Sequence, residues 1–301
     1  MRKTTGIVVA ALTLASCVDH AEGGAAVEQA ASAADARFLG PSAFAGRFVP
    51  RSSNTVTGGQ STFFGIITAL NLPREEVRRL LPPELHLAKT IDPGVSAHPV
   101  LLLFGHQNDA TTLSFGFPIP TFVSYRELIL VVPFVQERSG TTWYSYATRM
   151  YLDFATAKQI GEDYGYKKVL ARLEHSARGL EVRDEGTGSP IFDAETFSTG
   201  ALSSDAAASA QFPAYRSLKQ LLEMPIIGQK ADRTYACSYF ELDHDASSVM
   251  PVTLAARFHA PFTPEMGASW TDGVKHAVPD AAFFVNRVRW RLAWPPLSCG
   301  L

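Results

Sequence analysis

Two adjacent lysines, Lys167 and Lys168, are the residues of this chain whose types and spacing favour covalent chemistry. They follow Gly165 and Tyr166 and precede the apolar residues 169–171. An isolated lysine amine is protonated at neutral pH because its ordinary pKa is about 10.4. Two ammonium groups held beside an apolar wall each disfavour the charge on the other, and burial acts in the same direction. The pair therefore predicts either one nucleophilic amine or, more simply, two solvated lysines at the end of a helix.

The segments before the lysine pair predict a strand, a short helix and a glycine-containing turn that ends the helix. Residues 142–152 alternate in polarity, as a strand does. Asp153 follows, where its carboxylate can cap a helix over residues 153–164, and Gly161 and Gly165 mark the end of that helix. This order places the lysines at the start of the next strand.

Two further runs, residues 100–105 and 128–134, are apolar without interruption, which is typical of strands covered on both faces. Because neighbouring strand positions point to opposite faces, either Arg126 or Glu127 must enter an apolar layer. A buried charge requires a partner or a function. Both residues are therefore candidates for a site.

The remaining pattern indicates an α+β domain with mostly antiparallel strands. Strand-like stretches recur at residues 61–70, 252–260 and 286–294, whereas residues 214–223 have a helical pattern behind Pro213. The sequence has no Gly-rich phosphate loop, no zinc-protease motif and no Gly-x-Ser-x-Gly motif. The acidic stretch at residues 241–245 is typical of a solvated loop, so we expect no metal and no cofactor.

Three segments together resemble the acetoacetate decarboxylase family. They are MYLDFATAKQIGEDYGYKK at residues 150–168, YRE at residues 125–127 and LPPELHLA at residues 81–88. The resemblance covers residues 63–182 with the elements in the order of the family. It implies a closed, cone-like β-barrel of the acetoacetate decarboxylase type with a few short helices.

The resemblance also implies a reaction. In this family a lysine amine attacks the ketone of a β-keto acid, and the resulting iminium accepts the electrons released when CO2 leaves. By position, Lys167 is expected to be the nucleophile and Lys168 the cation that lowers its pKa, while Glu127 orients the amine or relays a proton. The chain lacks the proline that precedes the lysines of the family, so a slip of one residue would exchange the two roles.

Two positions depart from the pattern of the family. A second family glutamate corresponds to Leu103, and a family arginine on the first strand corresponds to Leu70 or Asn71. We therefore expect a substrate carboxylate to be held by Arg126 or Arg149, between which the sequence does not choose. An apolar substrate larger than acetoacetate would contact the aromatic residues Phe63, Phe64, Phe115, Phe117 and Tyr151.

The N-terminus has the features of an export signal. Arg2 and Lys3 precede an apolar stretch at residues 7–14 that is too short to cross a bilayer. The following Leu-Ala-Ser-Cys resembles the lipobox of bacterial lipoproteins, which predicts a signal peptide over residues 1–16 and lipid on Cys17. An ordinary signal peptide is the alternative. Because Val18 follows the cysteine, we expect the outer membrane, facing the periplasm, if the source is Gram-negative.

Residues 17–40 are rich in Ala, Gly, Glu and Asp and predict a flexible tether, followed by one domain over residues 41–301. With 46% hydrophobic and 19% charged residues, the composition is that of a globular protein. The formal net charge of −2 argues against nucleic acid as a partner.

Cys237 and Cys299 would lie in an oxidising compartment if the chain is exported, and there they can form one disulfide. Equally, Cys237 can be a small buried side chain within an alternating strand. The sequence leaves both alternatives open.

Two functions of different classes follow. The first is a Schiff-base-forming lyase that decarboxylates a β-keto acid, with aldolase or dehydratase chemistry as a variant of the same site. The second is a lipid-anchored periplasmic protein that binds an apolar small ligand in the barrel without catalysis. In both cases the partner is a small molecule and membrane contact is through the lipid anchor only. The family resemblance also implies self-association.

Overall fold

The structure is a computed structural model that describes residues 57–88, 96–119, 122–138, 140–176, 179–259, 262, 265, 268–271 and 273–299. The predicted signal peptide, Cys17 and the predicted tether lie outside the described residues, as do residues 41–56 of the expected domain. Strands dominate the described part of the chain, and its helices are short.

The strands are β1 (Gly58–Pro73), β2 (Leu85–Leu87), β3 (Ala97–Ser114), β4 (Phe117–Pro118), β5 (Val123–Glu137), β6 (Tyr144–Leu152), β7 (Lys168–Ser176), β8 (Gly179–Asp184), β9 (Pro190–Ser198), β10 (Ser203–Ser204), β11 (Ile226–Gln229), β12 (Tyr235–Ser238), β13 (Phe240–Asp243), β14 (Ser248–Phe258), β15 (Lys275–Ala293) and β16 (Leu297–Ser298). The helices are α1 (Arg74–Arg79), α2 (Ala155–Asp163), α3 (Asp205–Gln211), α4 (Pro213–Glu223) and α5 (Ala268–Thr271). Within the described ranges, no helix has the length and apolar character needed to cross a membrane.

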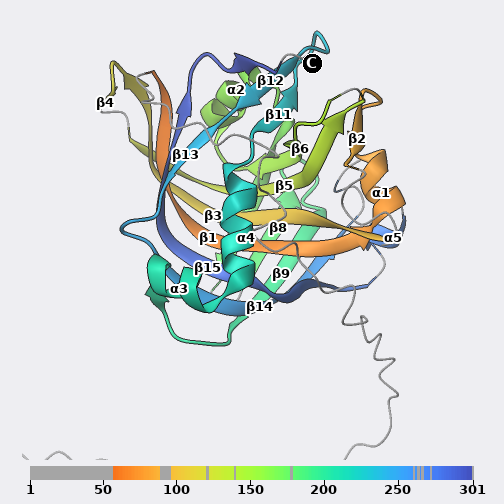
Figure 1. Ribbon diagram of the computed structural model, residues 1–301, viewed down its shortest axis with the longest axis vertical. Helices are drawn as coiled ribbons and strands as arrows, with labels where there is room; N and C mark the ends of the chain where they lie inside the picture. The colour runs from red at the N-terminus through yellow and green to blue at the C-terminus, as the bar shows by residue number, and fades with distance from the viewer. Residues whose placement is uncertain are drawn as a thin grey trace, which may run out of the picture.

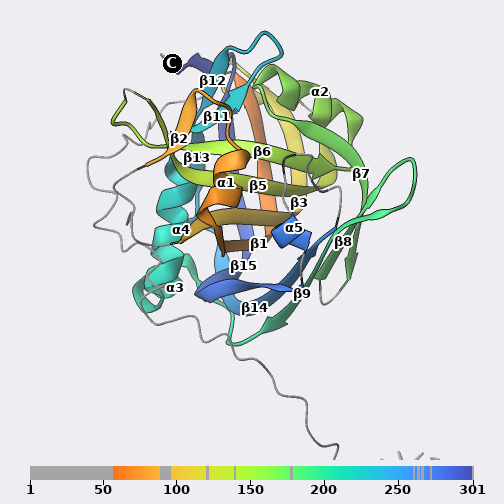
Figure 2. The same ribbon diagram turned by 90° about the vertical axis from the view of Figure 1, so that its right-hand side faces the viewer.

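Nine strands form a closed barrel (Figures 1 and 2). In order around the barrel they are β6, β7, β8, β9, β14, β15, β1, β3 and β5, and the pairing of β5 with β6 closes the ring. Neighbouring strands are antiparallel except β6 and β7, which run parallel because the chain returns through α2. The predicted α+β fold, a closed and mostly antiparallel β-barrel with short helices, is confirmed.

The sheet continues beyond the barrel on both sides. β11 pairs with β6 and β12 pairs with β11, while β13 pairs with the C-terminal part of β15. Helix α4 packs across the outer face of β1 and β15, in front of the barrel in Figure 1, through Tyr215, Leu218 and Leu221. This second layer covers the face of the shared strands that points away from the barrel interior.

Side-chain alternation along the shared strands divides the core into two layers. Leu128 and Leu130 of β5 face the barrel interior, where they join buried residues from all nine strands. Ile129 and Val131 of the same strand face the layer that contains α4. The apolar runs at residues 100–105 and 128–134 are therefore covered on both faces, as predicted.

The expected helix cap at Asp153 is wrong. The N-cap of α2 is Phe154, which provides no side-chain cap. Asp153 does not cap this helix because its carboxylate accepts hydrogen bonds from the backbone N–H and the guanidinium of Arg126.

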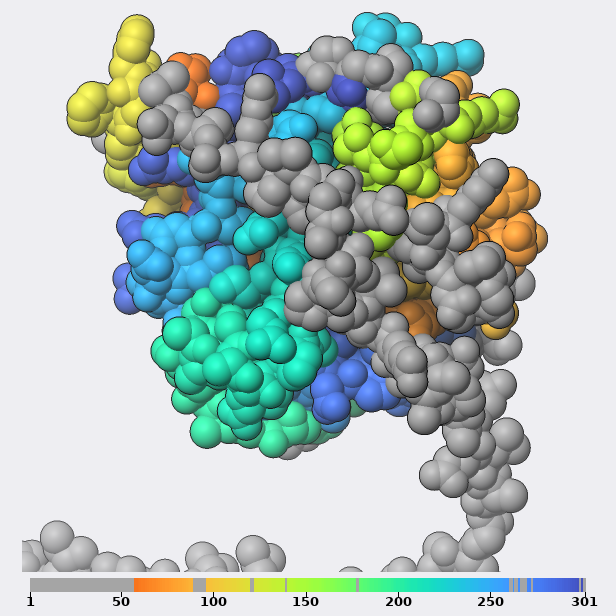
Figure 3. All heavy atoms as spheres, viewed as in Figure 1, coloured from red at the N-terminus to blue at the C-terminus, as the bar shows by residue number. Residues whose placement is uncertain are grey.

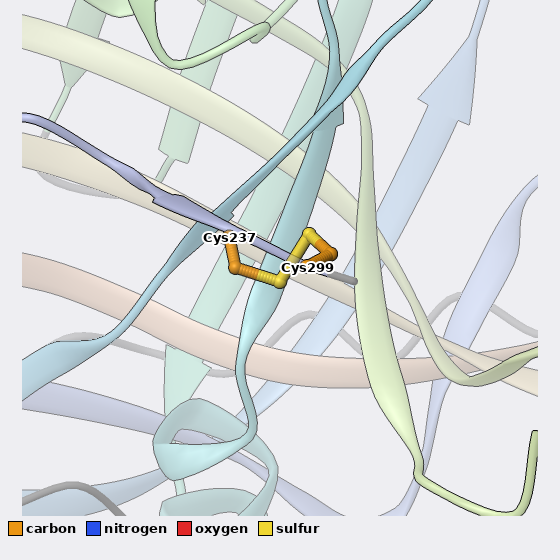
Figure 4. The surroundings of a disulfide bond; sticks show 2 residues. All are labelled: Cys237 and Cys299. Atoms are coloured by element: carbon orange, nitrogen blue, oxygen red, sulfur yellow. A yellow bond between two sulfur atoms is a disulfide. The ribbon is translucent and has the colours of Figure 1, made fainter. Parts of the chain in front are cut away.

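A disulfide joins Cys237 of β12 to Cys299 (Figure 4). The two residues are 62 positions apart, and their Cα atoms are 5.0 Å apart. Because β16 also pairs with β12, the bond fastens the C-terminal strand to the flank of the sheet. Of the two alternatives that the sequence left open, the structure has the disulfide.

Candidate functional site

Lys168 and Glu127 form a buried ion pair. Lys168 Nζ lies 2.9 Å from Glu127 Oε1, and the two side chains are only 8% and 5% exposed. Lys168 is the first residue of β7, Glu127 belongs to β5, and β6 lies between these strands. The pair thus bridges β6 on the face that points away from the barrel interior.

The ion pair lines a cavity of roughly 550 Å³. This volume is in the range of sites that bind small organic molecules. Most of the wall is apolar and comes from the outer faces of the shared strands, from α2 and from the ends of β13 and β15. The apolar lining includes Ala110, Val123, Ile129, Met150, Phe154, Ile160, Phe240, Trp290, Leu292 and Trp294.

Gln107, which belongs to no sequence motif, extends the polar cluster. Its Nε2 donates to Glu127 Oε2 at 3.4 Å, and its Oε1 accepts from Trp290 Nε1 at 2.8 Å. Trp290 therefore fixes the orientation of the amide, which in turn holds the carboxylate. One feature of the sequence points to Gln107. It is a polar residue on the same strand face as Leu103 and Gly105, and Gly105 pairs with Glu127 across the sheet.

Three tyrosines line the cavity as neutral phenols. Burial, together with the neighbouring Glu127 carboxylate, raises the pKa of Tyr125 well above its usual value. Burial also raises the pKa of Tyr164 to about 12 and raises that of Tyr166 further. These phenols stay protonated at neutral pH and add no negative charge to the cavity, and the Tyr164 hydroxyl donates to the backbone oxygen of Ala293 at 2.9 Å.

Gly161 makes room for the Lys168 side chain. A Cβ at Gly161 would lie 2.3 Å from Lys168 Cε and 2.4 Å from its Cδ. Atoms cannot approach this closely, so the lysine crosses α2 at the one position of that turn without a side chain. Since Glu127 holds the amine at the other end, the side chain has little freedom to move aside.

The structure separates the two lysines, contrary to the expected placement. Lys167 precedes β7 and points to the opposite face, as adjacent strand positions do. Its Nζ lies 3.9 Å from Glu265 Oε1, and its side chain is 40% exposed. Lys167 does not line the cavity, so the enclosed amine is that of Lys168, as the one-residue slip allowed.

The arginines and the tyrosine expected to bind substrate lie elsewhere, which corrects that expectation. Arg126 pairs with Asp153 at 3.2 Å and donates to the backbone oxygen of Leu173. Tyr151 donates from its hydroxyl to the backbone oxygen of Phe262 inside the barrel. Arg126 and Arg149 alternate with residues that line the cavity, Glu127 and Met150, and therefore point to the other face.

The expected aromatic wall is also different. Phe63 is buried in the layer covered by α4, and neither it nor Phe64 lines the cavity. Phe115 and Phe117 are 86% and 75% exposed, because they lie at the tip of a hairpin. Within the described ranges, no group of three His, Cys, Asp or Glu residues is placed to hold a metal ion.

Comparison with known proteins identifies enzymes that share this fold. No protein-family model matches the sequence, and no curated protein is detectably similar to it. Among solved structures, the enduracididine biosynthesis enzyme MppR complexed with pyruvate matches with a TM-score of 0.53 at 12% identity, over 83% of this chain and 92% of that chain. An acetoacetate decarboxylase-like enzyme from Sphingomonas wittichii RW1 matches with a TM-score of 0.53 at 13% identity, over 83% of this chain and 97% of that one. The chain therefore has the fold of the acetoacetate decarboxylase-like enzymes, as the sequence resemblance predicted.

Proposed function

We propose that this protein is a Schiff-base-forming lyase whose nucleophile is Lys168. The observation that supports the proposal is the burial of the Lys168 amine against Glu127 inside a mostly apolar cavity. A lysine that served only as a surface charge would gain nothing from this position, because removing an ammonium group from water costs several kcal/mol.

The pair contains the groups that imine formation requires. Transfer of a proton from the Lys168 ammonium to the Glu127 carboxylate yields a neutral amine beside a carboxylic acid. The amine attacks the carbonyl carbon of the substrate, and Glu127 returns the proton to the departing hydroxyl, which leaves as water. The product is an iminium ion opposite the regenerated Glu127 carboxylate, so the cavity keeps the same net charge.

Decarboxylation follows from the position of the iminium. When the substrate is a β-keto acid, the bond to the carboxylate carbon breaks and its electrons enter the iminium, which gives CO2 and an enamine. Glu127 takes up a proton from solvent and passes it to the enamine carbon, which restores an iminium, and hydrolysis of this iminium by water releases the ketone and the Lys168 amine. Apolar walls favour the step because the negative charge disperses as CO2 forms.

The lining favours an apolar substrate. Lys168 is the only basic side chain among the lining residues in the described part of the chain. The substrate carboxylate would therefore face the iminium itself and the neutral donors of Gln107 and Tyr125, with no arginine clamp. We propose a β-keto acid with an apolar chain that occupies the wall formed by Ile129, Met150 and Phe240.

Reductive trapping tests this proposal. The protein is incubated with a medium-chain β-keto acid and sodium borohydride, and peptide mass spectrometry locates the reduced adduct. We expect the adduct on Lys168, its loss in Lys168→Met, and its retention in the matched variant Lys167→Met. CO2 release should follow the same pattern. A folded wild-type protein without an adduct on Lys168 would refute the enzyme proposal.

The same experiment distinguishes the alternative function, a binding protein without catalysis. The lack of a second basic residue in the described lining favours this alternative. A binder would take up apolar carbonyl compounds, with the same affinity in wild type and Lys168→Met, and would yield no adduct. Aldol-type chemistry would instead yield the adduct without CO2. A condensation product is bound by MppR, which has the same fold with a TM-score of 0.54.

A further inference from the structure

A hairpin at one end of the sheet exposes a group of large apolar side chains. It connects β3 to β5 through β4 and stands out from the surface, in yellow at the upper left of Figures 1 and 3. Four of its side chains are exposed to solvent, namely Phe115 (86%), Phe117 (75%), Ile119 (40%) and Phe122 (54%). We call these four residues the hairpin tip.

The hairpin is uncharged over its whole length. Residues 110–125 contain no Asp, Glu, Lys, Arg or His. Phe115 and Gly116 have positive φ angles of 50° and 82°, which turn the chain sharply at the end of the hairpin. A Cβ at Gly116 would meet no atom within 4 Å in the described part of the chain, so the turn projects into open space. Water is an unfavourable environment for such a cluster.

The hairpin tip lies at the same end of the sheet as the chain entry and one edge of the cavity. Gly58, where β1 begins, pairs with Leu113 on one side and Ala293 on the other. The N-terminal region, which carries the lipobox-like Cys17, therefore joins the described fold beside the hairpin. Trp294 follows Ala293, lines the cavity and is 41% exposed.

We propose that the hairpin tip docks into the surface of a lipid bilayer. Aromatic side chains concentrate at the membrane interface, and a segment without charges enters it without the cost of removing an ion from water. The chain entry beside the hairpin agrees with a lipid-anchored N-terminus, although docking does not depend on lipidation or on the chemistry of Lys168. Thr111, Thr112 and Val123 at the base of the hairpin line the cavity, so docking places the cavity beside the bilayer.

A fluorescent label on the hairpin tests this docking. The full chain carrying Cys17→Ser and Phe117→Cys is labelled with an NBD fluorophore and mixed with vesicles of uncharged phosphatidylcholine. We expect the NBD emission to brighten and shift to shorter wavelength, equally at low and high salt. The matched label at Phe197→Cys, a residue that is 49% exposed on β9, should not respond. No response at position 117 while the chain sediments with vesicles overturns the proposal.

Substitutions provide an independent measure. Phe115→Ser with Phe117→Ser should weaken vesicle binding at least about tenfold, which corresponds to about 1.4 kcal/mol, because two aromatic rings no longer leave water on binding. The control Phe197→Ser with Leu202→Ser removes two other exposed apolar side chains and should leave binding unchanged. If the hairpin double variant instead dissociates an oligomer in sedimentation and leaves vesicle binding unchanged, the surface is a contact between copies of the chain.

Discussion

Lys168 combines burial with a specific partner, and both come from its position at the start of β7. Its side chain leaves the strand toward the layer that contains α2, passes over Gly161 and ends at Glu127. Lys167, one position earlier, ends near Glu265 at the surface. The difference between the two lysines is therefore a difference of strand face, since their sequence neighbourhood is shared.

The buried pair gives a test at the residue scale. Glu127→Gln and Lys168→Met should each lower the free energy of unfolding by about 3 kcal/mol, because each leaves one buried ion without its partner. The double variant should lose less than the sum of the two single variants, which a double-mutant cycle in urea measures. The matched control is the exposed pair of Glu75 and Arg78, which should show little coupling. Additive losses at Glu127 and Lys168 would contradict the pairing.

Gly161 gives a second test at this scale. Alanine normally stabilises a helix by up to about 1 kcal/mol relative to glycine. Gly161→Ala should nevertheless slow borohydride trapping on Lys168 at least about tenfold, because the new Cβ occupies the space of the lysine Cε and Cδ. In a Lys168→Ala background, the same change should raise the free energy of unfolding. Unchanged trapping in Gly161→Ala would show that the lysine does not cross the helix there.

At the scale of elements, β6 is the strand that connects the barrel to the strands on its flank. It pairs with β5 and β7 within the barrel and with β11 on the flank, so one strand connects both layers. The flank itself is narrow, because β11 and β12 have four residues each. The disulfide between Cys237 and Cys299 fastens its outer edge.

The disulfide should therefore carry a measurable share of the stability. Cys237→Ala with Cys299→Ala should lower the free energy of unfolding by about 2 to 4 kcal/mol, because the bond restricts the unfolded chain over a long loop. The measurement is urea denaturation without reductant. With reductant present, wild type and variant should unfold at similar urea concentrations. Equal stability under both conditions would show that the cysteines remain unpaired in solution.

At the scale of the whole molecule, the free energy of unfolding should decrease as the pH falls into the mildly acidic range. His98 of β3 is fully buried, with Nε2 3.0 Å from the backbone oxygen of Pro133. Burial lowers the pKa of His98 to about 4 from its ordinary value of 6.5. Between these two pH values the unfolded chain binds a proton that the folded chain does not bind. Acid therefore favours unfolding in this window, and the contribution of His98 is complete above pH 6.5.

Through the protonation of His98, we expect the free energy of unfolding to fall by up to about 1.4 kcal/mol for each pH unit below 6.5. Urea denaturation across this range measures the slope. His98→Asn keeps a donor for Pro133 and should flatten the slope. A slope from His175 and His244 should remain, since burial lowers the pKa of each to about 4. An identical slope in wild type and His98→Asn would contradict the assignment.

The fold could be predicted because its signals are local or shared with a family. The apolar runs at residues 100–105 and 128–134 required strands covered on both faces, whatever the partners. The segment at residues 150–168 required a strand, a helix and a lysine-bearing strand in that order. The cap of α2 was predicted wrongly, because a tertiary contact from Arg126 took the Asp153 carboxylate away from the helix.

The sequence by itself determined that a lysine pair follows a helix exit, that Glu127 or Arg126 enters an apolar layer, and that the strands need cover on both faces. Only the tertiary structure decided which members of these pairs meet. Glu127 and Lys168 are 41 positions apart, and Gln107 and Trp290 are 183 positions apart. Contacts at such separations depend on the order of strands in the barrel and on which face each side chain occupies. A shift of one residue along a strand reverses that face.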